Sequence, residues 1–145
     1  VRNASKSWIE HCDWLPAVLT GNLIPKKVLR SRCAAGHKAL WHPDWNGLPP
    51  EEYLTTLDPV LKGFRENLYE DTFTSDKKAG TLTDEWAKRL GLSNNVAVAV
   101  GAFDCHVGAV GGEITPNVLV RSIGTSTCDI MTAEYKNINQ KLIKG

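Results

Sequence analysis

Hydrophobic residues recur every three to four positions near the start of the chain. This period predicts a helix over residues 4–19 with one apolar stripe facing a core. The stripe consists of Trp8, Cys12, Leu15 and Leu19. Gly21 follows where a left-handed C-terminal cap is expected.

Two further helical patterns lie in the middle of the chain. One follows Pro49 and Pro50, and its apolar residues recur at helical spacing as far as Phe64, with Asp58-Pro59 as the point where the helix divides. The other covers residues 84–90, where Trp86 and Leu90 are expected to face inward. Residues 65–80 carry no clear period and are interpreted as a connection.

The pattern changes to strand-like runs in the last third of the chain. Residues 96–100 contain no polar side chain, which predicts a strand covered on both faces. A short helix of small residues is expected over 105–110. The runs 118–123 and 128–133, joined by residues 124–127, predict a hairpin with a polar tip. Helices interleaved with a buried strand are typical of an α/β protein.

The composition of the chain is ordinary and argues against only a few classes of protein. The chain has 145 residues, 42% of them hydrophobic, and a formal net charge of +1. These values argue against a disordered tail and against a nucleic-acid binder, which usually has a strong basic excess. No apolar run approaches the roughly 18 residues that a membrane span requires, and no signal peptide opens the chain. We therefore expect no nucleic-acid or membrane partner and a cytoplasmic location.

The ends of the chain and its cysteines carry further information. The chain begins at Val1 and its one methionine is Met131, so we expect a piece of a longer protein. The cysteines are Cys12, Cys33, Cys105 and Cys128. Their wide spacing does not fit a disulfide framework or a zinc site, so reduced, buried thiols and no protein-bound metal are expected.

Asp104 is the sharpest candidate for chemistry. It follows the predicted buried strand, and ligands of open α/β sheets bind beyond the carboxyl ends of strands. An aspartate in that place can act as a general base. It can also cap the small-residue helix that follows; position alone favours the cap, and the two roles are compatible.

Two other segments have residues suited to phosphate or sugar. Gly124 and the three hydroxyl residues after it can offer backbone and side-chain donors to a phosphate, or can form an ordinary turn. Lys38 can reach a sugar or phosphate oxygen, or can be a solvated surface lysine. The cations Lys26, Lys27, Arg30 and Arg32 are interpreted as a solvated face. Neither a P-loop nor a G-x-G-x-x-G fingerprint occurs.

Four segments, in order along the chain, resemble the FGGY carbohydrate kinases. They are CDWLP with LTG at 12–16 and 19–21, RCAAGHKALWH at 32–42, GAFDCHVGAVG at 101–111, and IGTSTCDI at 123–130. The third and fourth are similar to segments found across the family. The AGHK-x-LWH pattern and the FDCH pattern are similar to its ribulose-phosphorylating subgroup.

The resemblance implies an actin-like ATPase fold, with two ribonuclease-H-like domains on either side of a cleft. Residues 1–117 would be the later part of the sugar-binding domain. Residues 118–145 would begin the ATP-binding domain with its first hairpin.

The resemblance also implies roles for individual residues. Asp104 matches the catalytic base and lies against the substrate, and Lys38 matches a lysine that contacts the ketopentose. Gly124, Thr125 and Ser126 match a turn that faces the ATP phosphates. The implied reaction converts ATP and L-ribulose to ADP and L-ribulose 5-phosphate, a step of L-arabinose catabolism, with Mg²⁺ bridging the phosphates.

Alternatives from other classes remain open at this point. Another kinase of the family, acting on xylulose, gluconate or glycerol, carries the same general segments. A non-catalytic α/β module for sugar binding or protein interaction would use Asp104 only as a cap. The full-length enzyme is a possible homo-oligomer. The chain by itself is expected to be inactive, because it would supply only part of a cleft.

Overall fold

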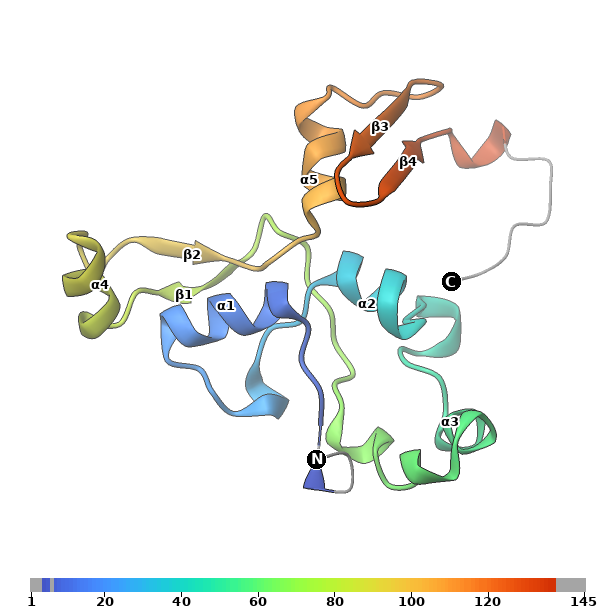
Figure 1. Ribbon diagram of the computed structural model, residues 1–145, viewed down its shortest axis with the longest axis horizontal. Coiled ribbons are helices and arrows are strands. Elements are labelled where there is room, and N and C mark those ends of the chain that lie inside the picture. Colours follow the sequence, from blue (N-terminus) through green and yellow to red (C-terminus); the bar gives the residue numbers. More distant parts are fainter. Residues whose placement is uncertain (1–3, 6, 138–145) are drawn as a thin grey trace. The chain divides into compact units, whose positions relative to one another are not determined.

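The structure is a computed structural model that describes residues 4, 5 and 7–137. It divides into two compact units, Val1–Ala102 and Phe103–Lys144. Figure 1 shows the helices and strands of both units along the chain.

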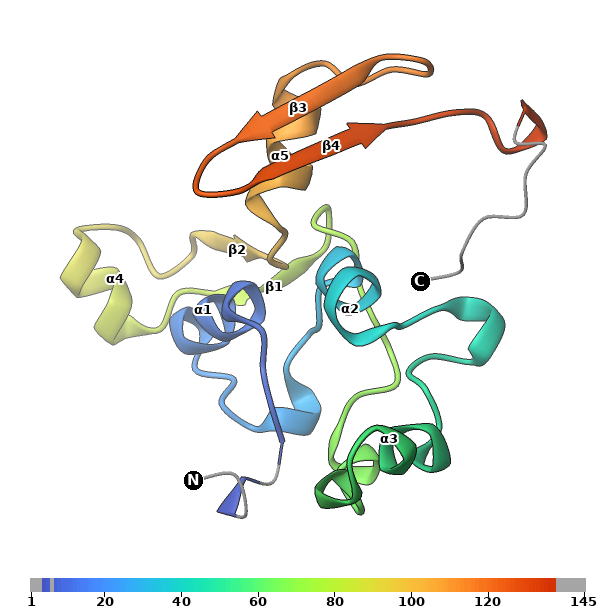
Figure 2. The same ribbon diagram turned by 45° about the vertical axis from the view of Figure 1, so that its right-hand side comes forward.

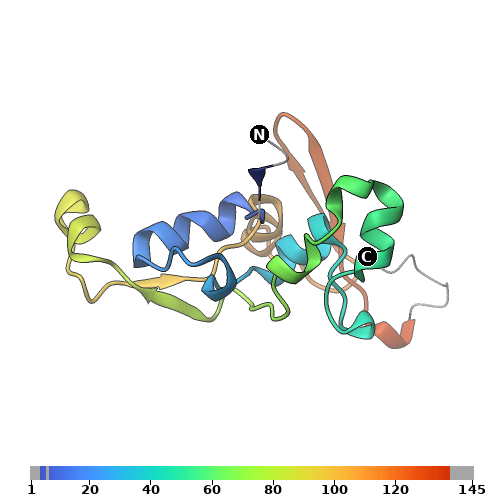
Figure 3. The same ribbon diagram turned by 90° about the horizontal axis from the view of Figure 1, so that it is seen from below.

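The first unit contains four α-helices and two strands among its described residues. The helices are α1 (His11–Thr20), α2 (Arg32–Ala39), α3 (Glu51–Leu57) and α4 (Asp84–Leu90). The strands β1 (Lys78–Thr81) and β2 (Ala97–Ala99) pair antiparallel. Short 3₁₀ turns occur at Pro25–Lys27, Pro43–Trp45, Pro59–Leu61 and Arg65–Asn67. Helix α1 lies along the β1–β2 pair, as Figures 1 and 3 show.

The first predicted helix is correct at its end and wrong at its beginning. Gly21 has φ of 72°, the left-handed cap that the sequence indicates. The helix begins at His11 rather than at residue 4. Trp8 precedes it and stacks on Phe64 with ring centroids 5.1 Å apart, so its burial comes from a residue distant in sequence.

The apolar stripe predicted for this helix is also wrong. Asp13 and Ala17 are its buried residues, whereas Leu15 remains 45% exposed. Asp13 and Ala17 are four positions apart and therefore share one face of α1. A charged residue occupies the buried face because its partners come from another segment, which spacing does not reveal.

The other two predicted helices form where they are expected. Helix α3 follows Pro50 and ends at Asp58, after which the Pro59–Leu61 turn begins, which confirms the predicted division. Helix α4 ends at Gly91 in the left-handed conformation. Their buried faces differ from the prediction, because Leu54 and Ala87 are buried while Leu57 and Leu90 are exposed.

The hydrophobic core of the first unit lies beneath α2. Its buried members are Ala35, Leu48, Leu68 and Tyr69. The partly buried residues packed against them are Trp8, Ala39, Trp41 and Phe64. Most of these residues come from segments outside helices, so helical periodicity identified only Trp8 and Phe64 among them.

Strand β2 is less covered than its sequence predicts. Ala97 and Ala99 are exposed and Val98 is partly buried, while Val100 just beyond the strand is 3% exposed. In the described part of the chain β2 pairs only with β1, and α1 packs against this pair. The prediction of a strand buried on both faces is therefore wrong for this structure.

The second unit contains one α-helix packed on one hairpin. Helix α5 (Asp104–Gly111) is followed by β3 (Leu119–Ile123) and β4 (Thr127–Met131), with a 3₁₀ turn at Tyr135–Asn137. The antiparallel pairing of β3 with β4 confirms the predicted hairpin. Figure 2 shows α5 against one side of it.

The sequence-based domain boundary stays a prediction. The two compact units meet between Ala102 and Phe103, whereas the expected family domains divide after residue 117. Residues 138–145 of the second expected domain lie outside the described residues. The described helices include none with the length and apolar character needed to cross a bilayer.

The chain passes very close to α1 at Gly101. A Cβ atom at this position would lie 1.9 Å from the Cys12 carbonyl oxygen, inside any possible contact distance. We therefore expect Gly101→Ala to lower the free energy of unfolding by about 3 kcal/mol, measured by urea denaturation.

Gly36→Ala is the matched control for this substitution. Gly36 lies inside α2, and a Cβ there would be 3.7 Å from the Trp41 carbonyl oxygen, an ordinary contact. Alanine should stabilise the helix by about 0.5–1 kcal/mol. Equal effects of the two substitutions would contradict the close approach at Gly101.

Candidate functional site

Asp104 is the first residue of α5, and its side chain is exposed. Phe103 occupies the N-cap position with extended backbone angles. The Asp104 carboxylate accepts a hydrogen bond from the Cys105 amide at 2.7 Å. Asp104 therefore lies in the first turn, where the helix dipole favours a negative charge, rather than at the cap position considered from the sequence.

Small residues allow α5 to approach the hairpin closely. A Cβ atom on Gly112 would lie 3.1 Å from Val120 Cγ1, and one on Gly108 would lie 3.3 Å from Ser122 Oγ. Near the beginning of α5, the Cys105 thiol forms a hydrogen bond with Cys128. Val120 lies farther from the β3–β4 turn than Ser122 and Cys128 do. The beginning of α5 therefore contacts the hairpin nearer to its turn than the end of α5 does.

Asp104 and the turn therefore lie at the same end of the second unit. Cys128 follows Thr127, the first residue of β4 after the turn, and Cys105 follows Asp104. The structure thus packs the helix that begins at Asp104 on the two strands that flank the Gly124–Ser126 turn.

The turn between β3 and β4 has three residues, all exposed: Gly124, Thr125 and Ser126. The Gly124 amide donates to the Ser126 carbonyl at 2.9 Å, so this donor is used within the turn. The hydroxyl groups of Thr125 and Ser126 and their backbone amides are the groups of this turn best placed to meet an anion.

An ion pair joins the strands two residues from the turn. Arg121 Nε lies 2.7 Å from Asp129 Oδ1, and Arg121 Nη2 lies 2.9 Å from Asp129 Oδ2. The hydrogen bonds from Arg121 lower the pKa of the Asp129 carboxyl. This two-point contact fixes the register of the hairpin directly below its tip.

Cys105 is shielded beside the aspartate. Partial burial, contact with the Cys128 thiol and the charge of Asp104 all raise the pKa of Cys105, in that order. All four cysteines are free and partly buried. Cys105 is therefore held as a neutral thiol that packs α5 on β4, a contact that its place in the sequence does not reveal.

Lys38 lies in the last turn of α2, and its side chain is exposed. It belongs to the first unit, whereas Asp104 belongs to the second. Its helix is short, eight residues from Arg32 to Ala39, and it ends at Leu40 with a φ of 56°. The contacts that hold α2 in place therefore also determine where Lys38 lies.

The beginning of α2 is held by a buried polar network that sequence analysis missed. The Ser31 amide donates to Asp13 Oδ1 at 2.7 Å, and Asp13 Oδ2 lies 3.9 Å from Arg30 Nη1. Asp13 is 2% exposed and Arg30 is 1% exposed. The guanidinium also donates to the Trp8 carbonyl at 3.2 Å and 3.3 Å and lies over the Tyr69 ring.

This network corrects the interpretation of the basic cluster. Lys26 and Lys27 are exposed as predicted, but Arg30 is fully buried. Arg32 is exposed yet engaged, since it donates to Thr72 and lies over the Trp41 ring. The buried acidic partner, eighteen residues away from Ser31 in sequence, was not recognised because nothing local distinguishes it.

Burial strongly affects the ionisation of Asp13. It raises the pKa of this carboxyl from 3.8 to about 6, with a smaller contribution from the charge of Glu10. The Ser31 amide, Arg30 and Cys12 act in the opposite direction but do not compensate for burial. Burial also lowers the pKa of Arg30 and raises the pKa of Tyr69 to about 12.

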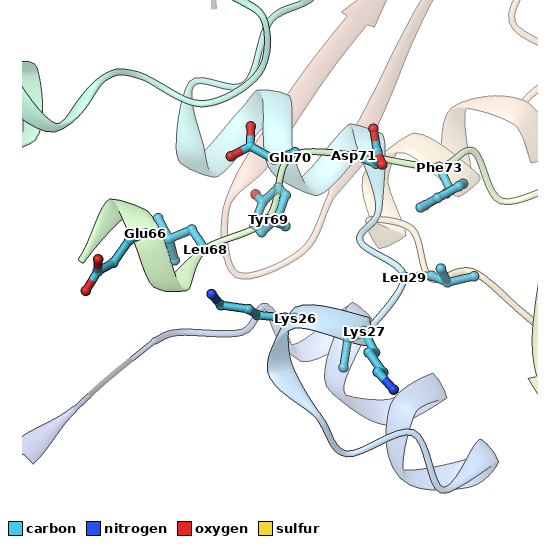
Figure 4. A pocket seen from close by; sticks show the side chains of 10 residues that line it. Lys26, Lys27, Leu29, Glu66, Leu68, Tyr69, Glu70, Asp71 and Phe73 are labelled. Atoms are coloured by element: carbon cyan, nitrogen blue, oxygen red, sulfur yellow. The ribbon is translucent and has the colours of Figure 1, made fainter. Parts of the chain in front are cut away.

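A pocket of about 400 Å³ lies next to this network. Its lining includes Tyr69, which also contacts Arg30, together with Lys26 and the acidic residues Glu66, Glu70 and Asp71. Figure 4 shows Lys26 reaching toward Leu68 across the pocket while Lys27 points away. None of the residues selected from the sequence as catalytic, substrate-binding or phosphate-binding lines this pocket.

Three relatives of this chain are each matched over a part of their length. A ribulokinase of Vibrio parahaemolyticus is 49% identical over 139 residues, 96% of this chain and 24% of that protein. Ribulokinases of Shouchella clausii and Halalkalibacterium halodurans are 38% and 37% identical, over 88% and 92% of this chain. The chain spans about a quarter of the length of these curated relatives. No protein-family model matches it.

These comparisons show that the chain is homologous to carbohydrate kinases. Within that class its relatives are ribulokinases, and the chain corresponds to one segment of them. The resemblance noted in the sequence is confirmed. The mixed α/β architecture agrees with the part of an actin-like fold that this homology implies.

Asp13 provides a test of the buried network through pH. Because its folded pKa is raised to about 6, the folded state binds a proton more tightly than the unfolded chain does. Its contribution to stability is therefore greatest at low pH and is lost as the pH rises through 6. Between pH 7 and pH 5 the wild-type chain should gain about 1 kcal/mol relative to Asp13→Asn.

Urea denaturation of both proteins at the two pH values measures this difference. Taking the difference cancels the other titrating groups, which the two proteins share. A wild-type chain that loses stability relative to the variant on acidification would show that Asp13 has a lowered pKa instead.

Proposed function

We propose that this chain is a segment of an ATP-dependent kinase that phosphorylates L-ribulose to L-ribulose 5-phosphate in L-arabinose catabolism. The proposal rests on homology to ribulokinases, together with the placement of Asp104 and the β3–β4 turn at one end of the second unit. The activity is proposed for the longer enzyme, since this chain spans about a quarter of its relatives.

In this proposal Asp104 is the general base. Its carboxylate is exposed at the beginning of α5 and accepts one hydrogen bond from the backbone, so acceptor capacity remains for a sugar hydroxyl. It would take the proton of that hydroxyl as the oxygen attacks the γ-phosphorus of ATP. A productive geometry requires a separation of about 2.6–3.2 Å between the two oxygens.

The turn of Gly124, Thr125 and Ser126 would contact the ATP phosphates. Thr125 and Ser126 offer hydroxyl and amide donors, while the Gly124 amide donates to the Ser126 carbonyl within the turn. Mg²⁺ would enter with the nucleotide and neutralise charge on the phosphates. Among the described residues no three His, Cys, Asp or Glu side chains form a group that could hold a metal ion.

Lys38 would hold the ketopentose. An ammonium group at the end of a flexible stem donates up to three hydrogen bonds, which suits a polyhydroxylated sugar. Its exposure leaves it accessible to a ligand. The hydrogen bond from the Ser31 amide to Asp13 holds the beginning of α2. This supports a binding role for Lys38, because a side chain binds a ligand more precisely when its helix is held in place.

Replacing the base tests the mechanism directly. In the longer kinase, Asp104→Asn should lower kcat by about 10²–10⁴-fold with little change in either KM, because the amide cannot accept the proton. Steady-state assays of ADP release measure this. Asp84→Asn is the matched control, since Asp84 is also exposed and is the first residue of a helix. Near wild-type turnover of Asp104→Asn would remove Asp104 from the mechanism.

Removing the lysine tests sugar binding. Lys38→Ala should raise KM for L-ribulose about tenfold or more and leave KM for ATP within about twofold, because a charged hydrogen bond to the sugar is lost. Lys88→Ala is the control, as Lys88 is an exposed lysine in the last turn of α4. Equal increases in both KM values would contradict a role specific to the sugar.

A further inference from the structure

We propose that Asp13 is a positioning residue for Lys38, acting through the buried hydrogen bond that fixes the beginning of α2. This inference rests on the proposed sugar-binding role of Lys38. Asp13 itself touches no ligand in this proposal. Its effect passes along the helix, from the Ser31 amide at one end to Lys38 in the last turn.

The hydrogen bond between Asp13 and Ser31 has the properties of a tether. Its length is 2.7 Å, and both residues are at most 2% exposed, so water does not replace it. An amide donating to a buried carboxylate is a charge-assisted bond, stronger than one between neutral groups. It links α1 to α2, two helices that the chain separates by a long loop.

Arg30 makes the position of this carboxylate specific. The guanidinium lies 3.9 Å from Asp13 Oδ2 and is itself bound to the Trp8 and Pro25 carbonyls. Arg30 Nε has no hydrogen-bond partner among the described residues, so the pair is not optimised for stability alone. A buried pair of this kind is better explained by the geometry that it imposes.

The rest of α2 transmits this position as a rigid body. The Ser31 carbonyl accepts from the Ala35 amide at 2.9 Å, and Ala34 and Ala35 are buried against the unit. Just past the far end, Trp41 Nε1 donates to the Glu70 carbonyl at 3.0 Å. The Arg32 amide donates to the Phe73 carbonyl at 2.9 Å, and the Arg32 side chain donates to Thr72. Loss of the tether at Ser31 leaves the beginning of α2 with these contacts to the 72–73 segment but without its bond to α1, so in this proposal the helix shifts and Lys38 changes its direction.

The test uses the longer kinase with three substitutions. Asp13→Leu removes the acceptor, while Asp13→Asn keeps an oxygen that can accept from Ser31. Ser31→Pro removes the donor instead, and the φ of −66° at Ser31 is compatible with proline. Asp58→Leu is the control, because Asp58 also accepts a backbone amide, that of Val60, but outside α2.

The expected result is a split between the two KM values. Asp13→Leu and Ser31→Pro should each raise KM for L-ribulose about tenfold, with KM for ATP within about twofold of wild type. Asp13→Asn should restore most of the sugar affinity, and Asp58→Leu should leave both KM values unchanged. An unchanged sugar KM in Ser31→Pro, or an Asp13→Asn enzyme as defective as Asp13→Leu, overturns the proposal.

Amide hydrogen exchange separates this inference from the proposed function. If the wild-type enzyme phosphorylates no ketopentose, the proposed function fails, and exchange still decides on the tether. The amides of α2 should then exchange at least about tenfold faster in Ser31→Pro than in wild type, with those of α3 unchanged. Equal protection of α2 in both proteins overturns the tether.

Discussion

The first unit depends on a carboxylate that is almost completely removed from water. Asp13 is buried on α1, and its cost is visible in a pKa raised to about 6. The protein recovers part of this cost from the Ser31 amide and from Arg30, which are supplied by the segment that leads into α2. The hydrogen bond and the ion pair of this carboxylate therefore join α1 to the segment that leads into α2.

The second unit depends instead on two glycines, whose lack of a side chain allows close packing. Gly108 and Gly112 let α5 lie directly on β3, where a methyl group would already be within 3.1–3.3 Å of Ser122 and Val120. This close packing directs the first residue of the helix toward the turn of the hairpin. Two glycines without reactive side chains thus help to place Asp104 and the turn at the same end of the second unit.

Sequence patterns predicted the elements that local rules determine. Gly21 and Gly91 end helices as expected, and the hairpin of β3 and β4 forms where two strand-like runs flank a polar turn. Burial was predicted poorly, and Asp13 shows why, because the partners that accompany its burial, Ser31 and Arg30, are distant in the chain. The candidate site residues came from motif resemblance, whereas the tether between Asp13 and Ser31 needed coordinates, since neither residue differs locally from a surface residue.

In this chain the buried polar groups hold elements together, and the exposed ones are the candidates for ligand contact. Asp13 and Arg30 form an ion pair away from solvent, whereas Lys38 and the Asp104 carboxylate are exposed. The backbone that carries an exposed side chain restricts its rotamers and so contributes to where its charged group lies. The accuracy of the proposed sugar contact is therefore set beneath the surface, at the beginning of α2, and that of the proposed base at the glycines of α5.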